Sequence, residues 1–400
     1  MGARNWAPKA IMKRILILGS TGSIGRNVLD VVRRHPDQFR VVGLAAHRNV
    51  DVLRAQCADH PDARFVVTDA AAAAAMAGDP ARRARFAGGD EAALIELVRE
   101  SGADLVVNAL VGFVGLAPTL AALEAGIPVA IANKESIVAG GELLLAAARK
   151  AGVELVPIDS EHVAIAQCLA GSSRGDVERV VLTASGGALR DRNPATLADV
   201  SVRDVLAHPT WRMGAKITVD SATLVNKGLE IIEAHWLFGF PYEKIDVVIH
   251  PQSIVHSVVR FVDGSMLAQM ATPDMRIPIL YALAYPNRLK SDLGANLLEF
   301  PALSFAPVDE SRYPCFRLAL AAAKAGGTAP TVLSAANEVA VEAFLAERLP
   351  YSALADVIAS ALEALPARPV RSLDDVVEAD REARRWIREH HTTATRGDGR

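Results

Sequence analysis

The sequence has little of what marks disulfide-rich, zinc-binding or nucleic-acid-binding proteins. Its three cysteines, Cys57, Cys168 and Cys315, are far apart and form no C-x-x-C pair. The sequence therefore indicates neither a zinc knuckle nor a disulfide framework, and it favours a reducing compartment. The formal net charge is −3, which does not suggest nucleic acid or an anionic membrane as a partner.

Long uninterrupted apolar segments are also missing. The apolar stretch 105–132 contains Asn108, Glu124 and two prolines, which is typical of buried strands and a helix rather than a membrane span. Residues 1–14 lack the apolar core of a signal peptide. With 51% hydrophobic and 22% charged residues over 400 positions, we expect a cytoplasmic enzyme of two or three domains.

The first part of the chain alternates strands and helices. Apolar strands are predicted at 14–18, 40–45, 104–108, 128–132 and 153–158, and helices at 26–34, 69–77 and 91–99. Continuous apolar strands that alternate with helices predict an α/β fold with a Rossmann-like, doubly wound parallel sheet. We assign residues 13–160 to this domain.

The pattern changes from about residue 178. Strands with longer connections predict a central α+β domain over 161–285, with a mixed or largely antiparallel sheet and a polar flap near 186–216. Residues 286–312 hold several prolines and are interpreted as a linker. A C-terminal helical domain is predicted over 313–390. Its expected helix caps are Ser334, Ser372 and Gly326.

A glycine turn follows the first strand. Gly19, Gly22 and Gly25 give a G-x-x-G-x-x-G spacing, a variant of G-x-G-x-x-G that lets backbone approach a pyrophosphate at a helix N-terminus. The second strand ends in LAAHRNV, without the acid that NAD enzymes use to bind the ribose 2′-hydroxyl. Arg48 stands at that place, which favours NADP(H) over NAD(H). The alternative is a solvated loop charge.

The stretch VPIDSEHVAIAQCL places Asp159 and Glu161 between two buried elements. One interpretation is capping, with Ser160 as a helix N-cap and Glu161 in the first turn. The other is a site for a hard divalent cation. Such cations take oxygen ligands, and open α/β sheets place their ligands at the carboxyl ends of strands.

The segment VDSATLVNKGLEIIEAHWLFG supplies a third carboxylate, Glu230. Asp220 or Ser221 is expected to cap the helix that this segment forms. Asn226 and Lys227 lie beside Glu230, as they would in a combined phosphate and metal site. A capped amphipathic helix with a polar outer face explains the segment equally well.

Two more segments offer hydrogen-bond donors. TASGG ends a strand at Ser185 and two glycines, where free backbone N–H groups can meet an anion. HPTWRMG contains His208, which beside a phosphate would be a donor. His250 and His256, in an apparently buried strand region, are interpreted as structural.

Seven motifs occur in a fixed order: GSTGSIG, ANKES, PIDSEH, TASGG, HPTWRMG, VDSATLVNKGLE and IHPQSIVHS. Together they resemble the 1-deoxy-D-xylulose 5-phosphate reductoisomerase family over nearly the whole chain, from about Ile15 to about Arg385. The resemblance implies an NADP-dependent oxidoreductase that rearranges and reduces 1-deoxy-D-xylulose 5-phosphate to 2-C-methyl-D-erythritol 4-phosphate in isoprenoid precursor synthesis. It also implies a homodimer and a small phosphosugar substrate. From the charge and the lack of long apolar segments we expect no nucleic-acid or membrane partner.

The same resemblance implies a set of site residues. Mg²⁺ or Mn²⁺, with Co²⁺ as a further option, would be held by Asp159, Glu161 and Glu230, and Lys134 joins these three as catalytic. Substrate contacts would come from Lys134, Ser160, Glu161, Ser185, His208, Ser221, Asn226, Lys227 and Glu230. NADPH contacts would come from Thr21, Gly22, Ser23, Ile24, Arg48, Asn49, Asn133, Glu135 and Gly214. The sequence departs from the family at 47–49, where HRN stands in place of GKN, so a cofactor contact from His47 is left open.

The flap carries a further expectation. A long polar connection inside a compact domain is often a lid, and Trp211 lies near its far end. We expect residues 205–214 to fold over bound substrate, with Trp211 covering its carbon chain; the alternative is a static loop. Two other functions stay open on the residues alone. They are an NADP-dependent dehydrogenase of another small phosphorylated substrate and a catalytically silent nucleotide sensor.

Overall fold

The computed structural model describes residues 12–77 and 86–391. Their first part forms a seven-stranded sheet in the order β4-β3-β2-β1-β5-β6-β7, with every adjacent pair parallel. The strands are β1 (Lys13–Leu18), β2 (Phe39–Ala46), β3 (Arg64–Val67), β4 (Phe86–Gly88), β5 (Leu105–Asn108), β6 (Val129–Ile131) and β7 (Leu155–Pro157). The helices are α1 (Ser23–Arg34), α2 (Val50–Asp59), α3 (Ala70–Ala77), α4 (Glu91–Glu100), α5 (Leu116–Glu124) and α6 (Lys134–Ala151).

The period of two along β1 explains why helices cover both faces of this sheet. Ile15 and Ile17 belong to the core shared with α1 and α2, whereas Leu16 and Leu18 belong to the core shared with α4 and α5. The strand order reverses between β1 and β5. Ligands of open α/β sheets bind outside the carboxyl ends of the strands at such a point, so the topology places the glycine turn there.

The central part contains the second sheet, in the order β11-β10-β8-β9-β12. β8 and β9 are parallel and the other pairs antiparallel, so the sheet is mixed, as expected. Its strands are β8 (Val177–Ala184), β9 (Ile245–Ile249), β10 (Val255–Phe261), β11 (Met266–Met270) and β12 (Ala306–Pro307). Its helices are α7 (Ser160–Cys168), α8 (Val202–Leu206), α9 (Ala215–Ala222), α10 (Val225–Phe238) and α11 (Arg276–Ala284). β12 lies within the segment interpreted as a linker, so part of that segment joins the sheet.

The C-terminal part is helical, as the sequence predicts. It contains α12 (Pro314–Ala325), α13 (Ala329–Leu345), α14 (Leu354–Ala364) and α15 (Leu373–His391). α13 is buried along most of its length and packs against α6, α9, α12, α14 and α15. The helical part therefore rests on both other parts of the chain.

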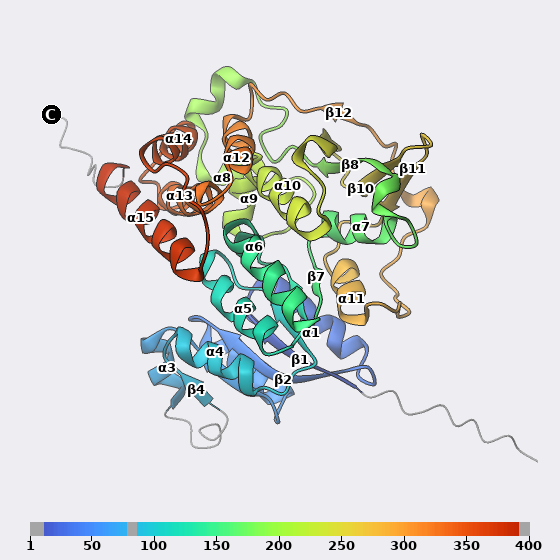
Figure 1. The fold of residues 1–400 in the computed structure, drawn as a ribbon, viewed down its shortest axis with the longest axis vertical. Coiled ribbons are helices and arrows are strands. Elements are labelled where there is room, and N and C mark those ends of the chain that lie inside the picture. The colour runs from blue at the N-terminus through green and yellow to red at the C-terminus, as the bar shows by residue number, and fades with distance from the viewer. Residues whose placement is uncertain (1–11, 78–85, 392–400) are drawn as a thin grey trace, which may run out of the picture.

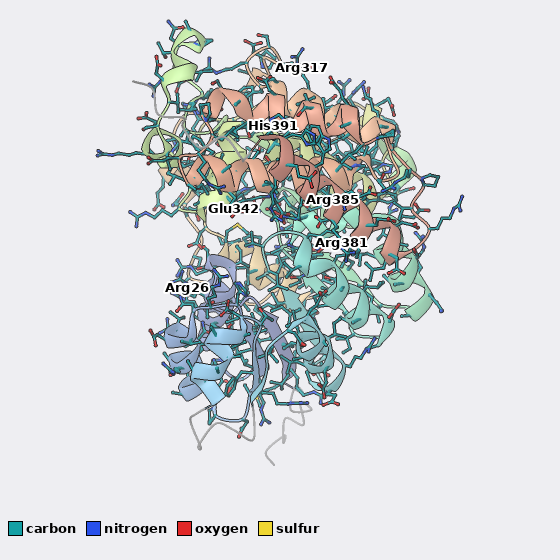
Figure 2. The ribbon with its side chains drawn as sticks, turned by 90° about the vertical axis from the view of Figure 1, so that its left-hand side faces the viewer. Arg26, Arg317, Glu342, Arg381, Arg385 and His391 are labelled. Atoms are coloured by element: carbon teal, nitrogen blue, oxygen red, sulfur yellow. The ribbon has the colours of Figure 1, made fainter. Side chains whose placement is uncertain are left out.

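The figures show how the three parts are arranged. In Figure 1 the N-terminal sheet lies below, the second sheet lies at the upper right, and the C-terminal helices lie at the upper left. Figure 2 shows Arg381, Arg385 and His391 on α15 above the N-terminal part, which carries Arg26. No helix among the described residues is long and apolar enough to cross a membrane.

Three expected helix caps are corrected by the structure. Ser334 lies buried inside α13, because the helix already begins at Ala329 with a proline in its first turn. Asp220 and Ser221 lie in the last turn of α9 rather than capping α10. The helical conformation is interrupted between α9 and α10 at Leu224, which adopts a left-handed φ of 60°. Ser160 is the first residue of α7 and the N-cap is Asp159. Ser372, by contrast, caps α15 and Gly326 ends α12, as predicted.

Candidate active site

A cavity of about 410 Å³ opens where the N-terminal sheet meets the central part of the chain. It is lined from four directions: by the start of α1, by the starts of α6 and α7, by α10, and by the end of the flap. It lies at the carboxyl edge of the N-terminal sheet. The following groups define it.

The three predicted metal carboxylates come together at one end of this cavity. Asp159 and Glu161 follow β7, and Glu230 reaches them from the middle of α10. Each offers one oxygen, and these three oxygens lie within 4.8 Å of one another. Because the two segments are about 70 positions apart in sequence, capping alone does not explain why they converge.

Two buried lysines stand between these carboxylates. Lys134 Nζ lies 2.5 Å from Asp159 Oδ2 and 3.1 Å from Glu230 Oε1. Lys227 Nζ lies 2.8 Å from Glu161 Oε1 and also contacts Glu230 Oε2. Three carboxylates against two ammonium groups leave one negative charge uncompensated. Asp159 Oδ2 also has no hydrogen-bond donor in suitable geometry.

The electrostatics of the carboxylates reflect this imbalance. Burial raises the pKa of Asp159 to about 6, and Glu230 and Glu161 add to the rise against the attraction of Lys134. Burial would also raise the pKa of Glu161, but Lys227 and Ser160 lower it to about 2. A divalent cation would supply the missing positive charge, and carboxylate oxygens are the ligands that Mg²⁺ and Mn²⁺ prefer. The residues present therefore fit a hard divalent cation.

A second buried pair lies behind the carboxylates. His162 Nε2 lies 2.9 Å from the backbone oxygen of Glu230, and His162 Nδ1 lies 3.5 Å from Glu233 Oε2. Burial lowers the pKa of His162 to about 4, so the ring is neutral and Nε2–H donates to Glu230. Sequence reasoning assigned neither residue to the site. The available signal was the i, i+3 spacing of Glu230 and Glu233 on one helix face.

The expected phosphate contacts also meet in the cavity. Ser185, His208, Ser221, Asn226 and Lys227 all line it. His208 Nδ1 accepts from the backbone N–H groups of Thr210 and Trp211, at 3.1 and 2.9 Å. Nε2 therefore carries the proton of the neutral ring and lies 2.9 Å from Ser185 Oγ. This arrangement presents donors and an ammonium group to an oxyanion.

The flap closes one side of the cavity in this structure. Trp211 and Met213 line the cavity, and the Trp211 ring centroid lies 6.1 Å from that of His256. The predicted structural role of His250 agrees with its contacts, since Nε2 accepts hydrogen bonds from the backbone N–H groups of Ile254 and Val255. A structural role is also predicted for His256, but this residue lines the cavity, because it lies at the start of β10, next to the site.

The glycine turn has the close backbone packing that a nucleotide site requires. Gly19 has φ +82°, and a Cβ there would lie 2.4 Å from the carbonyl oxygen of Ala109. A Cβ on Gly25 would lie 2.3 Å from the carbonyl oxygen of Gly19. Gly22 is the N-cap of α1 and supplies no side-chain acceptor, so no cap side chain competes with an anion for the N–H groups of the first turn. The turn therefore fits a dinucleotide diphosphate.

The predicted cofactor residues divide into two groups. Ser23, Ile24 and Gly214 line the cavity. The others, Thr21, Gly22, Arg48, Asn49, Asn133 and Glu135, do not belong to its lining. Arg48 and Asn49 follow the end of β2, where Arg48 Nε donates to Asp69 Oδ2 at 2.9 Å and Asn49 caps α2. Asn133 and Glu135 are buried at the start of α6.

Comparisons with known proteins bear directly on this site. The family described as 1-deoxy-D-xylulose 5-phosphate reductoisomerase matches residues 15–141, and models of its C-terminal domains match residues 155–238 and 270–386. A reductoisomerase of this name from Geobacillus kaustophilus is 51% identical over 381 residues, with 94% of this chain and 99% of the relative covered. The chain belongs to the 1-deoxy-D-xylulose 5-phosphate reductoisomerase family.

Two solved reductoisomerases have the same fold. The enzyme of Zymomonas mobilis in complex with NADPH is 39% identical with a TM-score of 0.87, covering 96% of this chain and 100% of the other. A DOX-P reductoisomerase in complex with NADPH, fosmidomycin and magnesium is 38% identical with a TM-score of 0.89, covering 94% and 98%. The α/β fold class, the mixed second sheet and the helical C-terminal part predicted from sequence are thereby confirmed.

Proposed function

We propose that this protein converts 1-deoxy-D-xylulose 5-phosphate to 2-C-methyl-D-erythritol 4-phosphate, using NADPH and Mg²⁺ or Mn²⁺, in the synthesis of isoprenoid precursors. The observation that carries the proposal is one cavity with three functions. Its carboxylate cluster, its anion donors and the first turn of α1 all face the same space. A reductoisomerase of a phosphosugar needs these three together, and solved relatives contain NADPH and magnesium.

Asp159, Glu161 and Glu230 would hold the divalent cation. A cation at this place supplies Lewis-acid polarisation of substrate oxygens and stabilises developing negative charge on them. Lys134 stands on the Asp159 side of the cluster and Lys227 on the Glu161 side. Each ammonium group is therefore positioned to donate to a substrate oxygen while it balances the buried carboxylates.

The substrate phosphate would lie against the donor group of the cavity. The His208 Nε2–H and the hydroxyl of Ser221 are neutral donors, and the Lys227 ammonium adds positive charge. Asn226 Nδ2 donates to Glu230 Oε1 at 2.5 Å, which links the phosphate end to the carboxylate cluster. Contacts to the phosphate and to the carboxylate cluster would together orient the sugar.

NADPH would bind along the carboxyl edge of the N-terminal sheet and supply the reducing equivalents of the second half-reaction. The N–H groups of the first turn of α1 would receive the diphosphate. Arg48, with an exposed side chain at the end of β2, would bind the 2′-phosphate. Met213 and Gly214 line the same cavity as Ser23 and Ile24 of α1, which supports a flap beside the bound cofactor.

The flap would keep water away from the reacting carbons. The family's reaction passes through an aldehyde, which must be held and reduced before it is released. Trp211 forms one wall of the cavity and supports this role.

The function is tested by mixing protein, NADPH, Mg²⁺ and 1-deoxy-D-xylulose 5-phosphate and following NADPH absorbance. The proposal predicts loss of NADPH that requires all four components. The alternative function, an NADP-dependent dehydrogenase of another small phosphorylated substrate, predicts turnover of such substrates without a metal. Turnover of that kind, with none on 1-deoxy-D-xylulose 5-phosphate, would refute the proposal.

We also propose that the protein is a homodimer. β11 is an edge strand of the second sheet, and its Met266 and Leu267 are 61% and 49% exposed. Exposed apolar side chains on an edge strand favour pairing with another copy. Sedimentation should give twice the 42.4 kDa chain mass, and Leu267→Lys should lower it. A wild-type protein that sediments as a monomer at micromolar concentration would contradict the homodimer.

A cytoplasmic location and the domain boundaries remain proposals as well. None of the three cysteines, all within the described residues, forms a disulfide, which supports a reducing compartment. Cell fractionation tests the location. We propose domains at 13–160, 161–285 and 313–390, with 286–312 as the linker between the last two. Two cores lie mostly within 13–160, which supports the first domain, whereas α9 and α10 share a core with the C-terminal helices. Limited proteolysis tests these boundaries, since cleavage should concentrate at them.

A further inference from the structure

A buried chain of polar side chains connects the three parts of the protein outside the carboxylate cluster. Glu135 Oε1 accepts a hydrogen bond from Lys216 Nζ at 2.5 Å. The same ammonium group lies 2.8 Å from Asp220 Oδ2, and Asn337 Nδ2 donates to Asp220 Oδ1 at 2.8 Å. We call these four residues the Glu135–Asn337 chain. It runs from α6 through α9 to α13.

The residues of the Glu135–Asn337 chain are buried, so each charged group depends on its partners in the chain. Glu135, Asp220 and Asn337 are 6%, 1% and 2% exposed. Burial alone would lower the pKa of Lys216, but Asp220 and Glu135 raise it well above its ordinary value, so the ammonium stays charged. Removing one partner from a buried charged group leaves the others uncompensated, so a change at one end is felt along the chain.

One end of the chain lies at the predicted cofactor site. Glu135 Oε2 accepts from Asn133 Nδ2 at 3.2 Å, and Asn133 Nδ2 also donates to the backbone oxygen of Gly112, at 2.9 Å, in the turn after β5. Lys216, in the middle of the chain, follows Gly214, the cavity-lining N-cap of α9 at which the flap ends. The Glu135–Asn337 chain therefore reaches both the start of α6 and the base of the flap, two segments that we expect beside the cofactor.

The other end lies in the helical part. Asn337 is on α13 and belongs neither to the cavity lining nor to the predicted site residues. Its amide fixes one oxygen of Asp220 and leaves the other facing Lys216. Without that donor one oxygen of the buried Asp220 carboxylate would lack a hydrogen-bond partner, and the carboxylate could turn away from its present position against Lys216.

We propose that Asn337 is a positioning residue for the cofactor, acting through Asp220 and Lys216 on Glu135 and on the base of the flap. This proposal rests on the NADPH part of the proposed function. It gives the C-terminal helical part a role in binding the cofactor, with the Glu135–Asn337 chain as the polar connection from α13 through α9 to α6. The competing explanation is that α13 merely packs against α6 and α9.

The test compares two substitutions on α13. Asn337→Leu removes the amide at similar volume. Thr331→Val is the matched control, because Thr331 is fully buried on the same helix and donates to Ala139 of α6 at 3.3 Å, outside the chain. NADPH affinity is measured by cofactor fluorescence, and Mn²⁺ affinity by electron paramagnetic resonance.

Asn337→Leu should weaken NADPH binding about two- to thirtyfold, the range found for changes that act through coupled residues. Thr331→Val should leave NADPH binding unchanged, and Mn²⁺ affinity should be the same in both variants. Two results would overturn the positioning role: wild-type NADPH affinity in Asn337→Leu, or the same loss of affinity in both variants. Wild-type protein that binds no NADPH would instead refute the proposed function.

A second series keeps the test decisive if Asn337→Leu fails to fold. Asn337→Ser, which leaves a small hydroxyl group, then takes its place. Lys216→Met removes the ammonium, and Lys216→Arg retains the charge and should restore part of the affinity. In the Lys216→Met background, the substitution at Asn337 should weaken NADPH binding little further, because the chain is already broken. If the loss of NADPH affinity in the double variant equalled the product of the losses in the two single variants, transmission through Lys216 would be contradicted.

Discussion

Replacing Glu230 with glutamine tests the metal assignment, because the structure predicts different effects of this change on stability without and with metal. Glu230 is 1% exposed, and it contacts both Lys134 and Lys227. Without a cation, three carboxylates oppose two ammonium groups, so Glu230→Gln brings the net charge of the cluster from −1 to zero. The metal-free variant should therefore unfold at a temperature close to or above that of the wild type.

The effect should appear when metal is added. At a concentration of one hundred times Kd, a bound cation stabilises the wild type by about 2.7 kcal/mol. Replacing even a hydrogen-bond partner of a metal ligand weakens metal binding about ten- to a hundredfold, and we expect a loss of at least this size in Kd when a charged ligand is replaced. At the same metal concentration the stabilisation of Glu230→Gln should then fall to about 0.4–1.4 kcal/mol or less.

Differential scanning calorimetry with and without Mg²⁺ measures this difference. Glu233→Gln is the matched control, a buried glutamate one turn away on α10. This control separates two possible metal sites. The second is formed by Asp159, His162 and Glu233, whose potential ligand atoms also lie within 4.8 Å of one another. Full metal stabilisation in Glu230→Gln together with its loss in Glu233→Gln would refute the assignment and move the cation to that second group.

Three other outcomes are expected. Arg48→Ala should raise KM for NADPH about ten- to a hundredfold while changing KM for NADH little, since a charge-assisted phosphate contact is worth about 1.5–3 kcal/mol; an equal effect on both cofactors in steady-state assays would remove Arg48 from the 2′-phosphate site. Trp211→Ala should lower kcat/KM sharply with little change in melting temperature, and hydrogen exchange over 205–214 should slow when NADPH, metal and a phosphonate substrate mimic bind; unchanged exchange argues against a closing flap. Because the pKa of Asp159 is raised to about 6 and metal binding needs the carboxylate, Mn²⁺ affinity titrated by electron paramagnetic resonance should fall roughly tenfold per pH unit below about 6; a flat profile from pH 5 to 7 would contradict this.

Short sequence patterns predicted the elements whose conformation is set by neighbouring residues in the chain. Strand β1 and the glycine turn after it follow from a short apolar run and from positions that tolerate no Cβ. The break between α9 and α10 could not be predicted in this way. Leu224 adopts a left-handed φ although it is not glycine, and tertiary packing of a 2% exposed side chain overrides its local preference.

The site was predictable only where its chemistry has a sequence signature. Asp159, Glu161 and Glu230 form motifs, and the structure brings them together. The pairing of His162 with Glu233 is not visible in sequence, because it depends on how α7 and α10 pack. Asn337 was missed for the same reason, since its partner Asp220 is 117 positions away. A buried polar residue inside an apolar helix was the only signal it gave.

The most direct test of the account is the identity of the product. 1-Deoxy-D-xylulose 5-phosphate would be incubated with the protein, Mg²⁺ and NADPH deuterated at the transferable position, and the product analysed by nuclear magnetic resonance. The account predicts a branched 2-C-methyl-D-erythritol 4-phosphate that carries one deuterium, formed only when metal is present. A straight-chain polyol phosphate carrying the deuterium would show reduction without rearrangement, and it would contradict the proposed function.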